Sequence, residues 1–354
     1  METGRLLIWI MGEWRLPKLF WFLEEFNTEA LRSLSNFMDS SGKFRGLQAT
    51  SNKKNIFTIL AVDHGASLAG TIRPDGADGV SYEEMVGVKR DVLSYLAPYA
   101  SGVLIDPVYG LAPAVLNGAL PGDVGMLLAV EDGDYASVER EARLFDGWSV
   151  AQAKRAGANG IKCFFYFHPE DKPVAIHQEK FVRQLAADCA EHDIPLFAEP
   201  LSYGVTAETR RRVVVETARQ VSRWDIDILK IEFPIDASVE RNEVVWRKAC
   251  EELSAASVTP WALLSAGVDF ETFAKQVEVA CKAGASGYLV GRAVWKEGVG
   301  LTGDEQVSFW RDVAQPRLMK LAKIATGLGK PWTDFYQFEV DVRPMGWHKA
   351  NPEK

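Results

Sequence analysis

The chain has 354 residues, of which 47% are hydrophobic and 25% charged, with a formal net charge of -8 and a pI near 5.4. This composition is ordinary for a globular protein and excludes a disordered or collagen-like chain. The acidic balance argues against a nucleic-acid partner, although a small anionic substrate needs only a local positive pocket. The four cysteines and five histidines show no metal-ligand or redox spacing, so we expect reduced thiols, a cytoplasmic protein and no metal or other cofactor.

Residues 1–26 contain two short apolar runs, Leu6–Met11 and Leu19–Leu23, with charged residues and a proline between them. Neither run reaches the ~18 to 20 apolar residues of a membrane span, and no signal-peptide arrangement is present. We therefore predict no membrane association. Residues 1–50 are interpreted as an N-terminal extension, with an amphipathic helix that covers one end of the fold or a subunit contact. A mis-assigned upstream start is the alternative.

From Asn55 onward, short β-branched runs alternate with longer stretches of helical character. The eight expected strands are Ile56–Val62, Gly102–Ile105, Met126–Val130, Gly160–Tyr166, Ile194–Ala198, Ile226–Ile231, Trp261–Ser265 and Gly287–Val290. Amphipathic helical spacing is found in Ser137–Ala156, Gln178–His192, Thr206–Trp224 and Phe270–Ala283.

Eightfold alternation of strand and helix predicts an α/β chain that forms a closed (β/α)8 TIM barrel over residues 51–328, with a C-terminal tail over residues 329–354. A doubly wound sheet is the alternative. It is disfavoured because no Gly-x-Gly-x-x-Gly follows the first strand and no Walker A lysine is present.

Lys230 is the most informative residue, because it lies with Glu232 in the short and mostly apolar run Ile226–Phe233. Alternation places Lys230 and Glu232 on one face of the expected strand, so we expect both groups to point into the same enclosed space. Burial disfavours the ammonium form of a lysine and makes the free amine available as a nucleophile. The alternative is a strand-end lysine whose amine reaches solvent.

Other polar residues follow the expected strands at their carboxyl ends, where the reactive groups of such barrels lie. They are Asp63, His64, Asp106, Glu131, Asp132 and Glu199, with Lys162 inside the fourth strand. A second ammonium group and a proton-shuttling carboxylate near Lys230 would suit covalent catalysis on a carbonyl. The alternatives are a structural ion pair for Lys162 and Glu199, and a turn or helix cap for Asp106.

Glycines and one arginine follow the last two strands. Ser265 and Gly267 come after the seventh strand, and Gly291 and Arg292 after the eighth. Barrels of this kind often bind phosphate there, through glycine amides and a helix N-terminus. Because Arg292 would add a bidentate positive group, we predict a phosphate or sulfonate site. Turn glycines and a surface ion pair are the alternative.

These residues also carry a resemblance to a known family, over about Thr28 to about Ala325. The shared motifs are Leu60–Asp63, Gly160–Lys162, Glu199–Pro200, Leu229–Pro234, Leu264–Val268 and Gly291–Trp295. The ordered set resembles the class I tagatose-1,6-bisphosphate aldolase family, including its sulfofructose-phosphate aldolase relatives.

The resemblance implies a Schiff base between Lys230 and the C2 ketone of a phosphorylated ketose. It also implies that Lys162 assists at the amine, that Glu199 acts as acid and base, and that Asp63 contacts substrate hydroxyls. The protonated imine would act as the electron sink for cleavage between C3 and C4, so no metal is needed. The products would be dihydroxyacetone phosphate and a three-carbon aldehyde.

One motif departs from the family pattern. The family usually has Asp-Gln-Arg after the first strand, whereas this chain has Asp63-His64-Gly65. A positive group that could meet one substrate terminus is absent there. Either His64 substitutes as a donor, or the substrate lacks one anionic end. Tagatose or fructose 1,6-bisphosphate is the expected substrate, 6-deoxy-6-sulfofructose 1-phosphate the close alternative, and a non-catalytic sugar-phosphate sensor the alternative of another class. The sequence also suggests a homo-oligomer.

Overall fold

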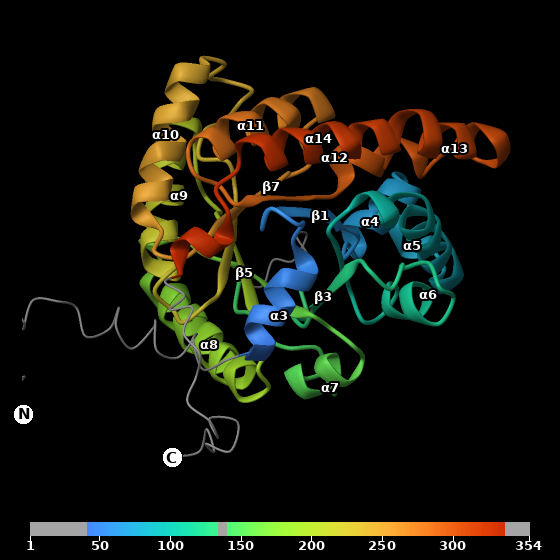
Figure 1. Cartoon of the computed structure of the whole chain (residues 1–354), viewed down its shortest axis with the longest axis horizontal. Helices are drawn as coiled ribbons and strands as arrows, with labels where there is room; N and C mark the ends of the chain where they lie inside the picture. The colour runs from blue at the N-terminus through green and yellow to red at the C-terminus, as the bar shows by residue number, and fades with distance from the viewer. Residues whose placement is uncertain (1–40, 134–139, 337–354) are drawn as a thin grey trace, which may run out of the picture. The chain divides into compact units, whose positions relative to one another are not determined.

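A computed structural model describes residues 41–133 and 140–336 of the chain. Eight parallel strands close into a barrel in chain order, with β8 paired to β1 (Figure 1). They are β1 (Phe57–Ala61), β2 (Gly102–Ile105), β3 (Gly125–Ala129), β4 (Gly160–Tyr166), β5 (Leu196–Leu201), β6 (Ile228–Ile231), β7 (Trp261–Leu264) and β8 (Gly287–Val290). The predicted (β/α)8 TIM barrel is confirmed, and each strand overlaps its predicted run.

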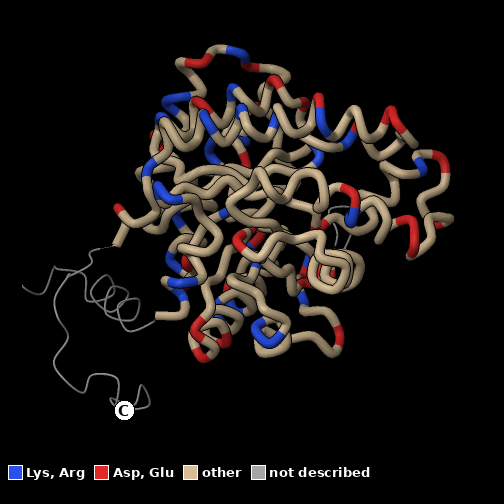
Figure 2. The backbone as a smooth tube through the Cα atoms, turned by 45° about the vertical axis from the view of Figure 1, so that its right-hand side comes forward, with Lys and Arg blue, Asp and Glu red and all other residues tan. Residues whose placement is uncertain are grey.

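Helices surround the barrel and bury their apolar faces against the outward-facing side chains of the strands. They are α3 (Ser41–Thr50), α4 (Ala66–Ile72), α5 (Tyr82–Leu96), α6 (Leu111–Val115), α7 (Val150–Arg155), α8 (Lys172–Glu191), α9 (Ala207–Val221), α10 (Glu243–Ala256), α11 (Phe270–Lys282), α12 (Arg292–Trp295), α13 (Gly303–Phe309) and α14 (Gln315–Leu328). Figure 2 shows charged residues spread over these helices, while the central strands are mostly uncharged.

The prediction of a helix over Ser137–Ala156 is wrong for residues 140–149, because α7 begins only at Val150. Before α7 the chain returns antiparallel to the end of β3. Glu131 bridges Leu144, and the Asp132 amide donates to the Arg143 carbonyl at 2.8 Å. This return places a loop, not a helix, beside the carboxyl end of the barrel.

Helix α3 closes the amino-terminal end of the barrel. A Cβ on Gly46 would lie 2.1 Å from the Asn159 carbonyl oxygen, and one on Gly125 would lie 2.3 Å from the Ala49 carbonyl oxygen. Only glycine permits these close approaches of α3 to the starts of β3 and β4. Helix α3 belongs to the predicted N-terminal extension, of which residues 1–40 lie outside the described part.

The predicted C-terminal tail is described as far as residue 336. Trp332 is buried and its amide donates to the Asn55 carbonyl at 3.0 Å, while the Tyr336 hydroxyl donates to the Asp227 carbonyl at 3.0 Å. This stretch therefore packs against the barrel. Residues 337–354 lie outside the described part, and the predicted domain boundaries stay predictions.

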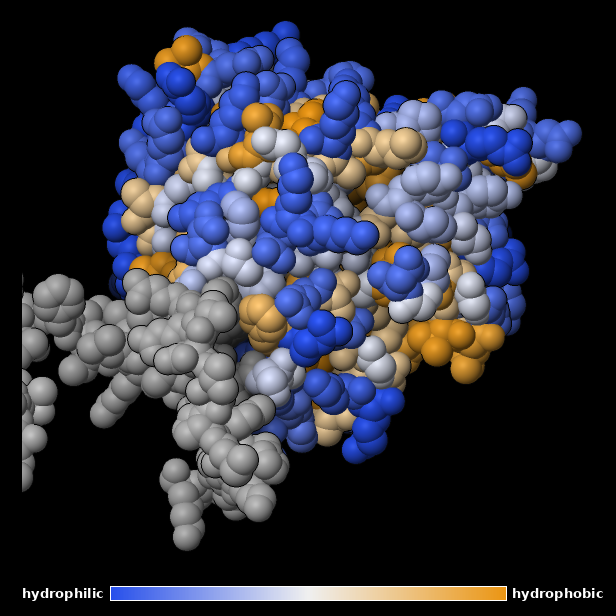
Figure 3. Space-filling view, in the orientation of Figure 1, coloured by the Kyte–Doolittle hydropathy of each residue, from blue (hydrophilic) through white to orange (hydrophobic). Residues whose placement is uncertain are grey.

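The visible surface is mostly hydrophilic, with an apolar patch over α6 (Figure 3). Val115 and Leu116 lie at the end of that helix and are exposed. None of the helices described has both the length and the apolar character that crossing a membrane requires.

Candidate active site

Lys162 lies at the centre of a buried charge cluster at the carboxyl end of the barrel. Its Nζ is 2.9 Å from Asp63 Oδ2, 2.5 Å from Glu131 Oε1 and 2.9 Å from Glu199 Oε2. The side chain is 2% exposed. Lys162 and Glu199 lie in β4 and β5, and Asp63 and Glu131 lie two positions beyond the ends of β1 and β3. Three carboxylates therefore share one ammonium group in a buried site.

Glu199 connects this cluster to Lys230. The Lys230 Nζ lies 2.7 Å from Glu199 Oε1, while the other oxygen of Glu199 faces Lys162. Alternation along β5 and β6 places both side chains on the inner face of the barrel, above Phe197 and Ile228. The structure thus brings together Asp63, Lys162, Glu199 and Lys230, as the sequence predicted. A carboxylate in direct contact with two amines can pass a proton to either.

The pKa values of two carboxyl groups in the cluster, Asp63 and Glu131, are shifted in opposite directions. Burial alone would raise the pKa of Asp63, but the ammonium groups of Lys162 and Lys230 outweigh that effect and hold its pKa well below the usual range. Burial raises the pKa of Glu131, with a smaller contribution from the nearby Asp63 charge, despite the opposing effect of Lys162. Asp63 is therefore ionised, and Glu131 is the carboxyl group of this pair that holds a proton more readily.

Glu131 is a cluster member that the sequence interpretation did not assign to the site. Its position directly after the third strand was visible, but the sequence offered no reason to prefer it over Asp132. The structure supplies the reason, since Glu131 Oε1 contacts Lys162 whereas Asp132 pairs with Arg143 at 2.9 Å.

His64 packs at the rim of the same cluster. Its ring meets Trp295 edge to face at 5.3 Å between centroids, and its Nδ1 lies 3.8 Å from Asp63 Oδ1. A Cβ on Gly291 would lie 2.7 Å from the His64 ring, so only glycine leaves room for it there. Burial, with a smaller contribution from Arg292, lowers the pKa of His64 to about 3 against the opposing effect of Asp63, so the ring is neutral.

The four residues predicted to bind an anion lie together beside His64. The Gly291 amide donates to Ser265 Oγ at 3.4 Å, and a Cβ on Gly267 would lie 3.7 Å from Arg292 Nη2. Gly267 has a φ of +75°, which glycine adopts without strain. Arg292 Nε is buried and has no hydrogen-bond partner among residues 41–133 and 140–336. This geometry leaves a guanidinium group available to an anionic ligand.

Asp106 has a turn role, one of the two predicted for it. Its Oδ1 accepts hydrogen bonds from the amides of Val108 at 2.9 Å and Tyr109 at 2.7 Å, and its Oδ2 is ion-paired with Lys89. Lys89 was missed, although it falls on the buried face of α5 in register with Met85 and Val92. A lysine at apolar helical spacing was the available signal.

Glu232 does not point into the same space as Lys230, although the sequence predicted that it would. Its carboxylate accepts hydrogen bonds from the amide and hydroxyl of Ser202 and pairs with Arg210 at 2.9 Å. Strand β6 ends at Ile231, so the alternation that fixes Lys230 no longer governs the next residue. Glu232 therefore links β6 to α9.

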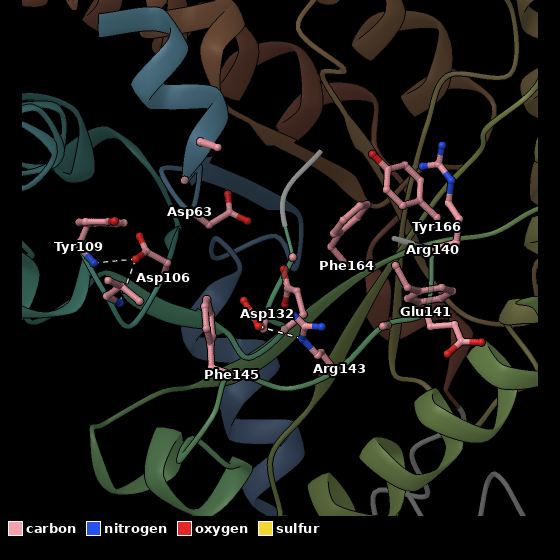
Figure 4. Close-up of a pocket in the computed structure, with 17 residues that line it drawn as sticks. Asp63, Asp106, Tyr109, Asp132, Arg140, Glu141, Arg143, Phe145, Phe164 and Tyr166 are labelled. Atoms are coloured by element: carbon pink, nitrogen blue, oxygen red, sulfur yellow. Dashed lines mark hydrogen bonds and ion pairs between the residues drawn. The ribbon is translucent and has the colours of Figure 1, made fainter. Parts of the chain in front are cut away.

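A cavity of about 360 Å³ opens beside the cluster. Figure 4 shows Asp106 and Tyr109 on one side of it, Tyr166 and Arg140 on the other, and Asp63 between them. Glu131 also lines it, so two of the carboxylates around Lys162 face the cavity. A small polar molecule that enters the cavity meets the charge cluster directly.

The chain is similar in sequence and in fold to known proteins. Residues 57–297 match the model of the DeoC/LacD family aldolases. Tagatose 1,6-diphosphate aldolase 2 of Streptococcus mutans is 30% identical over 325 residues, which cover 83% of this chain and 98% of that protein. Tagatose 1,6-diphosphate aldolase of Listeria monocytogenes serotype 4b is 31% identical over 334 residues, covering 86% and 97%. The crystal structure of an archaeal fructose 1,6-bisphosphate aldolase aligns with a TM-score of 0.54 at 22% identity over 80% of this chain and 98% of that one.

Proposed function

This chain belongs to the DeoC/LacD family of aldolases, and we propose that it is a class I enzyme in which Lys230 forms a Schiff base with the ketone of a phosphorylated ketohexose. The observation that carries the proposal is the contact chain from Lys230 through Glu199 to Lys162. A nucleophilic amine, a proton carrier and a second cation are the groups that imine chemistry requires.

The reaction begins when the free amine of Lys230 adds to the C2 carbonyl carbon. Glu199 lies 2.7 Å from the Lys230 Nζ, where it can give a proton to the carbinolamine oxygen as that oxygen leaves as water. Lys162 contacts the opposite oxygen of Glu199 and stabilises its ionised form afterwards. The result is a protonated imine between the Lys230 nitrogen and C2.

Cleavage follows from the electron demand of the protonated imine. The C4 hydroxyl loses its proton to Glu199, the C3–C4 bond breaks, and its electron pair moves through C3–C2 to the imine nitrogen to give an enamine. The three-carbon aldehyde leaves. Protonation at C3 and addition of water to C2 then release dihydroxyacetone phosphate and restore the Lys230 amine. In this scheme Asp63, held ionised beside Lys162, accepts hydrogen bonds from substrate hydroxyls.

The substrate phosphate on C1 would bind at the ends of β7 and β8, where Ser265, Gly267, Gly291 and Arg292 lie together. His64 is neutral there and can act as a hydrogen-bond donor. Tagatose and fructose 1,6-bisphosphate are the first candidates, since the relatives bear tagatose-diphosphate aldolase names. The sulfonated ketose 1-phosphate is the second. Cytoplasmic location and a homo-oligomeric state stay predictions.

Borohydride reduction tests the proposal, because it converts an iminium into a stable amine. Incubation with dihydroxyacetone phosphate and borohydride should add one adduct, located on Lys230 by peptide mapping and absent from Lys230→Met. Lys282→Met is the matched control, since Lys282 pairs with Glu278 on the outer helix α11. A protein that binds the ligand but gives no adduct would overturn the covalent mechanism and favour the sensor function.

A further inference from the structure

We propose that Arg140 recognises the second anionic group of the substrate, on the part of the ketose that leaves as the aldehyde. The inference rests on the proposed function, and it specifies the substrate class as a ketose 1-phosphate with another phosphate or sulfonate at its far end. Arg140 lines the cavity that also contains Asp63 and Glu131 (Figure 4). Asp63 and Glu131 both contact Lys162, which Glu199 links to Lys230, so a substrate held at Lys230 that extends along this cavity approaches Arg140.

Charge pairing within the cavity singles out Arg140. Lys162 is ion-paired with the carboxylates of the cluster, and Lys89 is ion-paired with Asp106. Asp132 pairs with Arg143 at 2.9 Å, and Glu141 faces the His177 ring at 3.8 Å. In the described part of the chain, Arg140 has no carboxylate within 4.0 Å of its guanidinium group. A partly buried cation without a counter-ion attracts an anionic ligand.

The side chain of Arg140 is held in place by two aromatic rings. Its guanidinium carbon lies 4.1 Å from the centroid of the Tyr166 ring and 4.7 Å from that of Tyr203. The Tyr203 hydroxyl donates to Asp171 Oδ2 at 2.6 Å, which fixes that ring. Stacking holds the guanidinium plane and leaves its N–H groups to hydrogen-bond at the edge.

The backbone of Arg140 is fixed as well. Gln178 of α8 is fully buried and donates to the carbonyls of Arg140 and Tyr166, and its side-chain oxygen accepts from the Ala142 amide at 3.2 Å. This single glutamine ties the loop to the end of β4. Arg140 is thus positioned before any ligand arrives, which lowers the entropic cost of binding.

The experiment compares two substrates that differ only at the far end. We expect Arg140→Gln to lower kcat/KM for fructose 1,6-bisphosphate by about 100-fold, and that for fructose 1-phosphate by less than about 3-fold. Arg140→Lys should fall between the wild type and Arg140→Gln, because it keeps the charge and loses the bidentate fork. Arg143→Gln is the matched control, since Arg143 already pairs with Asp132, and it should leave the ratio of the two kcat/KM values unchanged.

Equal losses on both substrates, or no loss on either, would overturn the assignment of Arg140. Borohydride trapping of dihydroxyacetone phosphate by Arg140→Gln shows that the variant is folded and keeps its amine, because that ligand lacks the far end. Calorimetric binding of fructose 1,6-bisphosphate to Lys230→Met, with and without Arg140→Gln, measures recognition without turnover. Loss of affinity in the Arg140→Gln background, together with a wild-type protein that traps no adduct, would uphold the Arg140 site and reject the Schiff-base function.

Discussion

Two buried lysines at opposite ends of the barrel show how the same type of side chain can have different roles. At the amino-terminal end, Lys43 of α3 faces one carboxylate, with Nζ 2.9 Å and 3.2 Å from the two oxygens of Asp227. Asp227 Oδ2 also accepts from the Leu196 amide at 2.8 Å. At the carboxyl-terminal end, Lys162 contacts three carboxylates, one of which also contacts Lys230.

The difference lies in the charge balance. One lysine and one carboxylate at the amino-terminal end cancel, and neither group borders the cavity. Around Lys162 and Lys230, two amines face Asp63, Glu131 and Glu199, so the fully ionised cluster carries one excess negative charge. That excess is relieved by one proton, which the raised pKa of Glu131 favours. A balanced pair holds the fold together, whereas a cluster with a movable proton suits acid–base chemistry.

Replacement of Lys162 should have the largest effect on catalysis. In Lys162→Met the three carboxylates lose the cation that they share, so the charge balance on which proton transfer in the cluster depends is lost. We expect kcat to fall by about 1,000-fold or more, measured by coupled detection of the triose products. A Lys162→Met enzyme within 10-fold of the wild type would show that Lys162 has only a structural role.

Replacement of Lys43 should lower the stability of the fold and leave catalysis nearly unchanged. Lys43→Met leaves Asp227 buried without its cation, which we expect to lower the free energy of unfolding by about 3 to 5 kcal/mol in urea titrations. The kcat of the folded protein should stay within 2-fold of the wild type. The double replacement Lys43→Met with Asp227→Leu should recover much of the stability, because it removes the unpaired charge. A large loss of kcat in stable protein would contradict the assignment.

The sequence predicted the barrel because each strand carries its own local signal. Runs such as Gly160–Tyr166 and Gly287–Val290 match β4 and β8 residue for residue. The catalytic candidates were also predictable, since parallel strands bring the residues at their carboxyl ends to one rim. Alternation then fixed which side chains point inward.

The sequence could not predict contacts that depend on loops and helix packing. The segment before α7 has helical spacing, yet residues 143–145 pair antiparallel with the end of β3. The Asp146–Gly147 turn, where Gly147 has a φ of +66°, then leads into α7. That error hid Arg140 in an expected helix. Lys89 stands at apolar helical spacing, which indicates burial, but its partner Asp106 follows from how α5 approaches the end of β2, which that spacing does not encode.

The carboxyl-terminal end should also make the fold sensitive to mild acid, through His64. Its pKa of about 3 in the folded protein lies below the value of 6.5 for an unperturbed histidine, so between these values the unfolded chain binds more protons. The contribution of His64 to stability is therefore complete above pH 6.5 and decreases as the pH falls toward 3.

Urea titrations from pH 5 to 8 give the free energy of unfolding at each pH. Below pH 6.5, we expect its slope against pH to be steeper in wild type than in His64→Gln, by up to about 1.4 kcal/mol per pH unit. His177→Gln on α8 is the control and should keep the wild-type slope. Identical slopes for wild type and His64→Gln would mean that the pKa of His64 is the same in the folded and the unfolded chain, so that the folded protein also protonates the imidazole below about pH 6.5.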